Sequence, residues 1–143
     1  MSVPYVALDL RIPSDIRQVE RVVETVADTC RALHLPSRQC SLNIPVALSE
    51  ALSNAILRGN REDLSKSVRL RTLVSEHSLV FEVWDEGPGF DLRSSTHDPT
   101  ELRNLYREDG RGLFLMQKLM DRVEQCRDNG NVVRLTLNRP ASQ

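Results

Sequence analysis

An alternating apolar stretch that ends in an acidic, glycine-rich turn is the feature that most constrains the fold of this sequence. Apolar residues at positions 79, 81 and 83 predict a β-strand, and the strand runs into Asp85 and then Gly87 and Gly89. Two glycines separated by one residue let a backbone turn sharply beside a flat ligand, because neither carries a Cβ. A carboxylate fixed at the end of a strand accepts a hydrogen bond from an amino group such as that of adenine. The same pattern also occurs in ordinary turns.

Length, charge and cysteine usage narrow the class of protein. The 143 residues suit one domain with a substantial core, and the net charge of -1 gives no bulk attraction to nucleic acid or to an anionic membrane. Only 4% of the residues are aromatic, which argues against a base-stacking surface. The three cysteines are scattered, which favours reduced thiols, and neither a signal peptide nor a membrane-spanning stretch is expected. These features predict a cytoplasmic protein that contacts neither nucleic acid nor membrane directly.

The N-terminal third predicts a strand followed by an amphipathic helix. Residues 5–12 alternate between apolar and charged side chains, Pro13 ends the strand, and Ser14 is a favourable N-cap for a helix from Asp15 to about His34. The opposite face is charged and is expected to be solvated, with a partner contact through Arg17, Arg21 and Glu24 as the alternative. The apolar stripe comprises Ile16, Val19, Val23, Val26, Ala27, Cys30 and Leu33.

A second helix, from about Arg38 to Leu57, carries two polar residues on an otherwise apolar surface. From Val46 onward apolar residues lie nearly all the way round, so this helix should be mostly buried, and Gly59 is a natural stop. Glu50 and Asn54 lie one turn apart on the same face. Because burying a carboxylate and an amide without partners is costly, they either cap a neighbouring loop or form a prepared polar site, and we favour the site.

Two hairpins and a long loop complete the chain. Residues 68–85 predict an antiparallel hairpin, and residues 123–137 predict another around Asp128-Asn129-Gly130. The segment Asp91–Glu108 is long and polar, as functional loops often are. Gly110-Arg111-Gly112 then precedes a helical run, where free backbone N–H groups would suit phosphate; a plain hinge is the alternative.

The ordered set of motifs resembles the Bergerat ATP-binding fold of gyrase, heat-shock chaperones, histidine kinases and mismatch-repair ATPases. The motifs are Glu50-x-x-x-Asn54, Asp85-x-Gly87-x-Gly89 and Gly110-x-Gly112. Within that group the chain is most similar to the small bacterial anti-sigma factor serine kinases. The resemblance implies a single histidine-kinase-like ATPase domain over residues 1–143. Its fold would be a two-layer α/β (α+β) sandwich with helices on one face of a mixed, mostly antiparallel sheet.

The same resemblance implies ATP and Mg²⁺ as ligands and assigns roles to individual residues. Glu50 would be the general base, Asn54 would hold Mg²⁺, and Asp85 would bind the adenine amine. An ATP lid would cover about residues 91–112, and Arg107 would steady the transferred phosphoryl group, with Arg103 and Arg111 as alternatives. The remaining ATP-binding residues would be Gly87, Gly89, Gly110, Arg111, Gly112 and Leu113.

The resemblance also implies partners. Such a protein would phosphorylate an anti-anti-sigma protein, sequester a sigma factor and form a homodimer. One alternative is a binding module that uses ATP to switch partners without phosphotransfer, and another is a regulatory kinase of a pathway without a sigma factor.

Three positions depart from the pattern of this family. Pro45 interrupts the helix that carries Glu50 and should kink it or mark a fresh start, which would aim the base differently. Arg58 stands where relatives often have a histidine. Gly130-Asn131 replaces the usual Gly-Thr, which is expected to weaken nucleotide affinity.

Overall fold

The computed structural model describes residues 3–87, 108–127 and 130–140, and its strands form one sheet in the order β1-β2-β3-β5-β4. All four pairings between these strands are antiparallel, so the predicted two-layer fold is confirmed with an antiparallel rather than a mixed sheet. The strands are β1 (Tyr5–Pro13), β2 (Ser67–Val74), β3 (Ser78–Asp85), β4 (Arg122–Arg127) and β5 (Asn131–Asn138).

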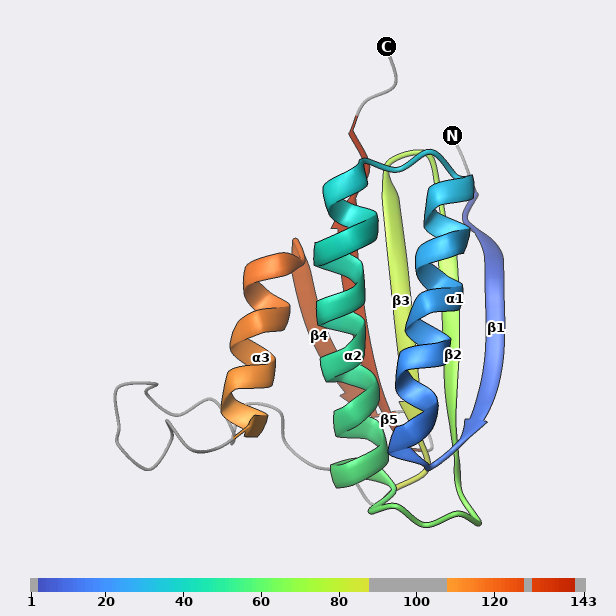
Figure 1. Ribbon diagram of the computed structural model, residues 1–143, viewed down its shortest axis with the longest axis vertical. Helices are drawn as coiled ribbons and strands as arrows, with labels where there is room; N and C mark the ends of the chain where they lie inside the picture. The colour runs from blue at the N-terminus through green and yellow to red at the C-terminus, as the bar shows by residue number, and fades with distance from the viewer. Residues whose placement is uncertain (1–2, 88–107, 128–129, 141–143) are drawn as a thin grey trace.

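The helices pack side by side on one face of this sheet, as Figure 1 shows. Alternate residues of β2 and β3 point toward the helices and form the core, in which Leu48, Phe81 and Leu135 are fully buried. The helical segments are η1 (Ile16–Gln18), α1 (Val19–Ala32), η2 (Gln39–Asn43), α2 (Ile44–Asn54), η3 (Ala55–Gly59) and α3 (Glu108–Leu119).

The outer face of the sheet carries the charged half of each alternating strand. Arg69 of β2 forms a bidentate pair with Asp9 of β1, at 2.9 and 2.7 Å. Arg134 of β5 contacts Glu82 of β3 at 2.8 Å. Glu82 is buried, whereas the Arg69–Asp9 pair is exposed, and an exposed pair adds little stability. The strand period rather than charge therefore fixes which face is buried.

The start of the first helix differs from the prediction. A 3₁₀ turn precedes α1, and the carboxylate of Asp15, not the hydroxyl of Ser14, accepts the capping hydrogen bond from the Arg17 N–H at 3.0 Å. The tighter turn changes the phase of the apolar stripe. Ile16 is therefore 41% exposed, whereas Val22 of α1 is buried.

The central helix is continuous from η2 through α2 to η3, and Pro45 lies in the first turn of α2. The missing N–H of a proline is tolerated there, so the predicted interruption does not occur and the backbone stays helical on both sides of Pro45. By length and composition alone, this 21-residue segment, Gln39–Gly59, is the one helix among the described residues that would reach across a membrane, although no such stretch was expected. Half of its most apolar window is buried within this domain, as in the core helix of a folded domain.

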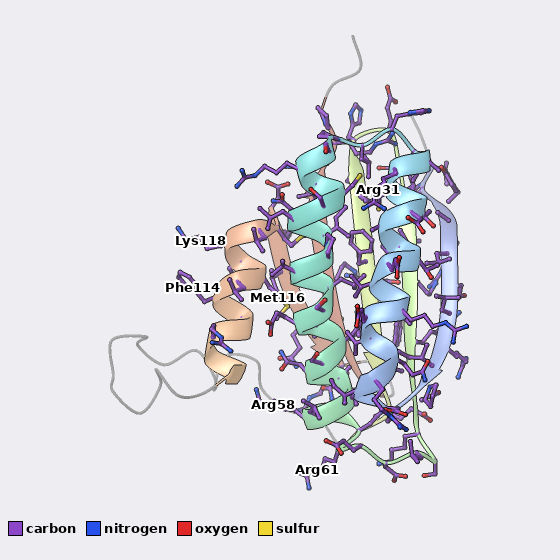
Figure 2. All side chains as sticks on the ribbon, viewed as in Figure 1. Arg31, Arg58, Arg61, Phe114, Met116 and Lys118 are labelled. Atoms are coloured by element: carbon purple, nitrogen blue, oxygen red, sulfur yellow. The ribbon has the colours of Figure 1, made fainter. Side chains whose placement is uncertain are left out.

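Helix α3 begins at Glu108, so Gly110 and Gly112 lie inside the helix rather than ahead of it. Glycine lowers helix stability only modestly, and packing overrides its preference. Met116 is fully buried and points toward α2, whereas Phe114 and Lys118 point away from it (Figure 2). Residues 108–112 of the predicted lid are therefore helical, and Gly112 is buried.

Candidate active site

Three segments far apart in the sequence meet at one end of the molecule. The C-terminal end of α2 with η3, the end of β3 and the start of α3 all lie at the lower end of the view in Figure 1. Each carries one of the predicted motifs. The antiparallel sheet and the direction of each helix therefore bring the motifs together, which the order of motifs alone did not require.

Gly112 of the Gly110-x-Gly112 motif lies against the Glu50-x-x-x-Asn54 motif of α2. A Cβ added to Gly112 would lie 2.8 Å from Oε2 of Glu50 and 3.7 Å from Nδ2 of Asn54. Glu50 is half-buried and Asn54 is 8% exposed. The absence of a side chain at position 112 therefore leaves α3 room to lie against both polar groups of α2.

The buried amide of Asn54 fits a role at a bound metal ion. Its Nδ2 has no hydrogen-bond partner among the described residues. Rotating the amide exchanges nitrogen for oxygen, which is a hard ligand suited to Mg²⁺. The described residues contain no group of three His, Cys, Asp or Glu side chains that would hold a metal unaided. Mg²⁺ commonly takes one or two protein ligands and completes its shell with phosphates and water.

Asp85 ends β3 as a buried carboxylate that is only 4% exposed. Its Oδ1 accepts hydrogen bonds from the Gly87 N–H at 2.9 Å and from Nδ2 of Asn131 at 3.1 Å. Burial raises the pKa of Asp85, and these two hydrogen bonds and the charge of Lys66 partly oppose the shift. Within the described part of the chain both hydrogen bonds go to Oδ1, which leaves Oδ2 to accept from a ligand.

Two glycines near Asp85 allow neighbouring segments of the chain to approach more closely than a residue with a side chain would permit. A Cβ on Gly59 would overlap the Asp85 carboxylate, at 2.8 Å from Oδ1 and closer still to its other atoms. A Cβ on Gly87 would overlap the carbonyl oxygen of Gly59. The sequence predicted Gly59 only as a helix stop, and its contact with Asp85 depends on tertiary structure.

Asn131 departs from the family pattern, but it has a definite place in this site. The residue is 1% exposed and orients Asp85 through its Nδ2, while its Oδ1 is buried without a partner among the described residues. The amide therefore supports the carboxylate predicted to contact adenine. The expected loss of affinity from this substitution stays a prediction.

The other predicted residues are distributed differently. Leu113 is 4% exposed and packs in the hydrophobic core, so only its backbone would be available to a ligand. Arg111 is exposed on α3, and Arg58 is half-buried at the lower end of η3 (Figure 2). Gly89, Arg103 and Arg107 lie outside the described residues, as does the lid up to residue 107.

Gly112→Ala should separate the geometry of the site from the stability of the fold. The new Cβ would displace the flexible end of Glu50. We expect the phosphotransfer that the family resemblance implies to fall by about tenfold to 100-fold, because small misplacements of reacting groups are costly. The helix should gain up to about 1 kcal/mol, since alanine is the better helix former. Turnover and thermal unfolding measured together test this. Gln117→Ala, at an exposed position of α3, is the control; equal turnover in both variants would contradict the contact.

The fold and the site are those of an ATPase-type nucleotide-binding domain. Comparison with known protein families gives the same class. Residues 12–137 match the histidine kinase-like ATPase domain, and the chain belongs to this family. The match covers every described element from the end of β1 to the end of β5.

Among individual proteins, the chain is similar to the serine-protein kinase RsbW of several bacteria. It is 34% identical to that of Bacillus subtilis over 99 residues, which are 66% of this chain and 62% of the relative. It is 28% identical to that of Bacillus velezensis over 140 residues, 94% of this chain and 86% of the relative. The chain thus spans less than two thirds of the length of the Bacillus subtilis relative.

The solved catalytic domain of the histidine kinase ThkA has the same fold. Its TM-score is 0.56, and the match covers 92% of this chain and 96% of that domain. The sequence identity is 14%, so this likeness concerns the fold alone.

Proposed function

We propose that this protein is an ATP-dependent protein serine/threonine kinase of the anti-sigma type. The observation that carries the proposal is the contact of Gly112 with both Glu50 and Asn54 at the end of the sheet where Asp85 lies. A group to accept a proton, a group to hold a metal ion and a group to bind a base would thereby lie along a single site. The similarity to serine-protein kinases supports the reaction type.

Asp85 would select the base. Its Oδ2 accepts a hydrogen bond from the exocyclic amine of adenine, while Oδ1 remains held by Gly87 and Asn131. Gly87 and Gly89 let the backbone pass beside the base. A buried acceptor left unpaired is unfavourable, so a purine without an amino group at this position would bind less tightly.

The phosphates would lie between α2 and the start of α3. Asn54 would hold Mg²⁺ through its amide oxygen, and the ion would neutralise charge on the transferred phosphoryl group. Gly110, Arg111 and the backbone of Leu113 would contact the phosphates from α3. Arg107, or Arg103 or Arg111 in its place, would stabilise negative charge as the phosphoryl group moves.

Glu50 would act as the general base. It lies one helical turn from Asn54, so a serine hydroxyl aligned with the γ-phosphate would be within reach of its carboxylate. Glu50 takes the hydroxyl proton as the serine oxygen forms its bond to phosphorus and the bond to ADP breaks. Its half-buried position lets a protein substrate approach from outside.

By resemblance, the substrate would be an anti-anti-sigma protein, and the kinase would also bind a sigma factor as a homodimer in the cytoplasm. The face of α1 around Arg21 and Glu24 is one candidate contact for such a partner, because both side chains are exposed on the helix that covers the β1 side of the sheet. Its alternative is a simple solvated face.

Incubating the purified protein with [γ-³²P]ATP, Mg²⁺ and its cognate anti-anti-sigma protein as acceptor tests the proposal. We expect label on a serine or threonine of the acceptor and none when Mg²⁺ is chelated. ATP binding without any labelling would overturn the kinase assignment in favour of a module that switches partners without phosphotransfer.

A further inference from the structure

We infer that Asn60 is a positioning residue of the base pocket, holding the turn after β3 so that Asp85 faces the nucleotide. The inference rests on the proposed nucleotide site and extends it to a residue that would touch neither ATP nor the acceptor. Asn60 follows η3 and is 1% exposed.

The base end of the site needs such a support. Gly59 and Gly87 bring two backbones together with no side chain between them, because a Cβ on Gly87 would overlap the Gly59 carbonyl oxygen. Glycine leaves each backbone free to move. The separation of the two segments, and hence the direction of the Asp85 carboxylate, must be fixed by a neighbouring group.

Asn60 supplies three fixed hydrogen bonds at this junction. Its Oδ1 accepts from the Glu86 N–H at 2.8 Å, and its Nδ2 donates to the Ser67 carbonyl at 3.0 Å and to Oγ of Ser14 at 2.9 Å. The orientation of the amide is determined, because a backbone N–H only donates and a carbonyl oxygen only accepts. One buried side chain thus ties the turn after β3 to the start of β2 and the end of β1.

Ser14 completes the support from the far side. Its hydroxyl is 1% exposed and donates to the Lys66 carbonyl at 2.6 Å, so it presents a lone pair to Nδ2 of Asn60. The predicted capping role of Ser14 is taken by Asp15, and the buried hydroxyl is used here instead. The two residues form a connected polar group with both hydroxyl and amide satisfied.

The Glu86 side chain is a second, outer tie on the same turn. Its Oε2 accepts from the Ser67 N–H and from Oγ of Ser67 at 3.2 Å. Because Glu86 is exposed, water competes for these bonds, whereas Asn60 is shielded from water. The buried amide should therefore determine the position of Asp85 more strongly than the exposed carboxylate does.

Comparing a ligand that uses the base pocket with one that does not tests the inference. Asn60→Asp keeps the acceptor for the Glu86 N–H but places a carboxylate oxygen against the Ser67 carbonyl. We expect it to weaken Mg-ATP binding by about tenfold or more, while the affinity for Mg-tripolyphosphate stays within about twofold. Ser14→Ala, which removes one bond to Asn60, should weaken ATP binding by about twofold to fivefold. Both affinities are measured by calorimetry.

Ser65→Ala is the matched control, because its hydroxyl bonds Asp63 in an exposed loop. Equal losses for ATP and tripolyphosphate, or no loss for either variant, would overturn the positioning role. If Asn60→Asp fails to fold, the Ser14→Ala variant tests the inference through the same comparison of the loss in ATP affinity with the loss in tripolyphosphate affinity. Wild-type protein that binds neither ligand would overturn the proposed function itself, whereas tight ATP binding by both variants would overturn only this inference.

Discussion

Asp85→Asn should lower the affinity for ATP by about 100-fold or more while leaving the protein without ligand at least as stable as the wild type at neutral pH. The Gly87 N–H and Nδ2 of Asn131 both require an acceptor at Oδ1, so the new amide must keep its oxygen there. Its NH₂ group would then face the adenine amine. Two donors would meet in a buried site where an acceptor is needed.

The stability of this variant should depend on pH in a defined direction. Burial raises the pKa of Asp85 above its ordinary value of 3.8, so between about pH 4 and the raised pKa the folded wild type holds a proton that the unfolded chain has lost. The free energy of unfolding of the wild type therefore falls as pH rises from about 4 through the raised pKa. The new amide cannot ionise, so the free energy of unfolding of the Asp85→Asn variant does not fall in this way. Its melting temperature should therefore exceed that of the wild type at pH 7 but not at pH 3, where the Asp85 carboxyl is protonated.

Titration with ATP and ITP and melting curves at the two pH values measure both effects. The ratio of ATP to ITP affinity should fall, because the new donor suits a keto oxygen. Asp28→Asn is the control, since that side chain is 70% exposed on α1. Unchanged ATP affinity in Asp85→Asn would exclude this carboxylate as the base-binding group.

Glu50→Gln should reduce phosphotransfer by about 10²-fold to 10⁴-fold, the usual contribution of a positioned general base. ATP affinity should change by less than about threefold, because the base acts on the acceptor hydroxyl in the transition state rather than on bound ATP. Glutamine keeps the size of the side chain, so the contact with Gly112 is preserved while the proton acceptor is lost.

Single-turnover labelling of the acceptor, with ATP binding measured separately, tests this expectation. Glu124→Gln is the control, because Glu124 lies in β4 and pairs with exposed Arg122 at 3.5 Å. Turnover in Glu50→Gln equal to that of this control would remove Glu50 from the mechanism. A parallel loss of ATP affinity would instead indicate a role in nucleotide binding.

Local patterns in the sequence predicted most of the elements, because strand alternation and helix periodicity depend on near neighbours. The strand ending at Asp85, the hairpin before it and the buried helix around Glu50 are all present. Errors occurred where two local preferences competed. Ser14 and Asp15 are both good caps, and the 3₁₀ turn selected Asp15. Gly110 and Gly112 suggested a loop, but docking of α3 made them helical.

The sequence by itself determined that two polar side chains, Glu50 and Asn54, interrupt a largely apolar helix. Their spacing of four residues placed them on one face of that helix. Tertiary structure alone decided what they meet: Gly112 against both, Gly59 beneath Asp85, and Asn60 joined to Ser14 and Glu86. These contacts join residues up to 62 positions apart, as for Glu50 and Gly112. Such distances are set by how the helices pack on the sheet, and local periodicity carries no information about that packing.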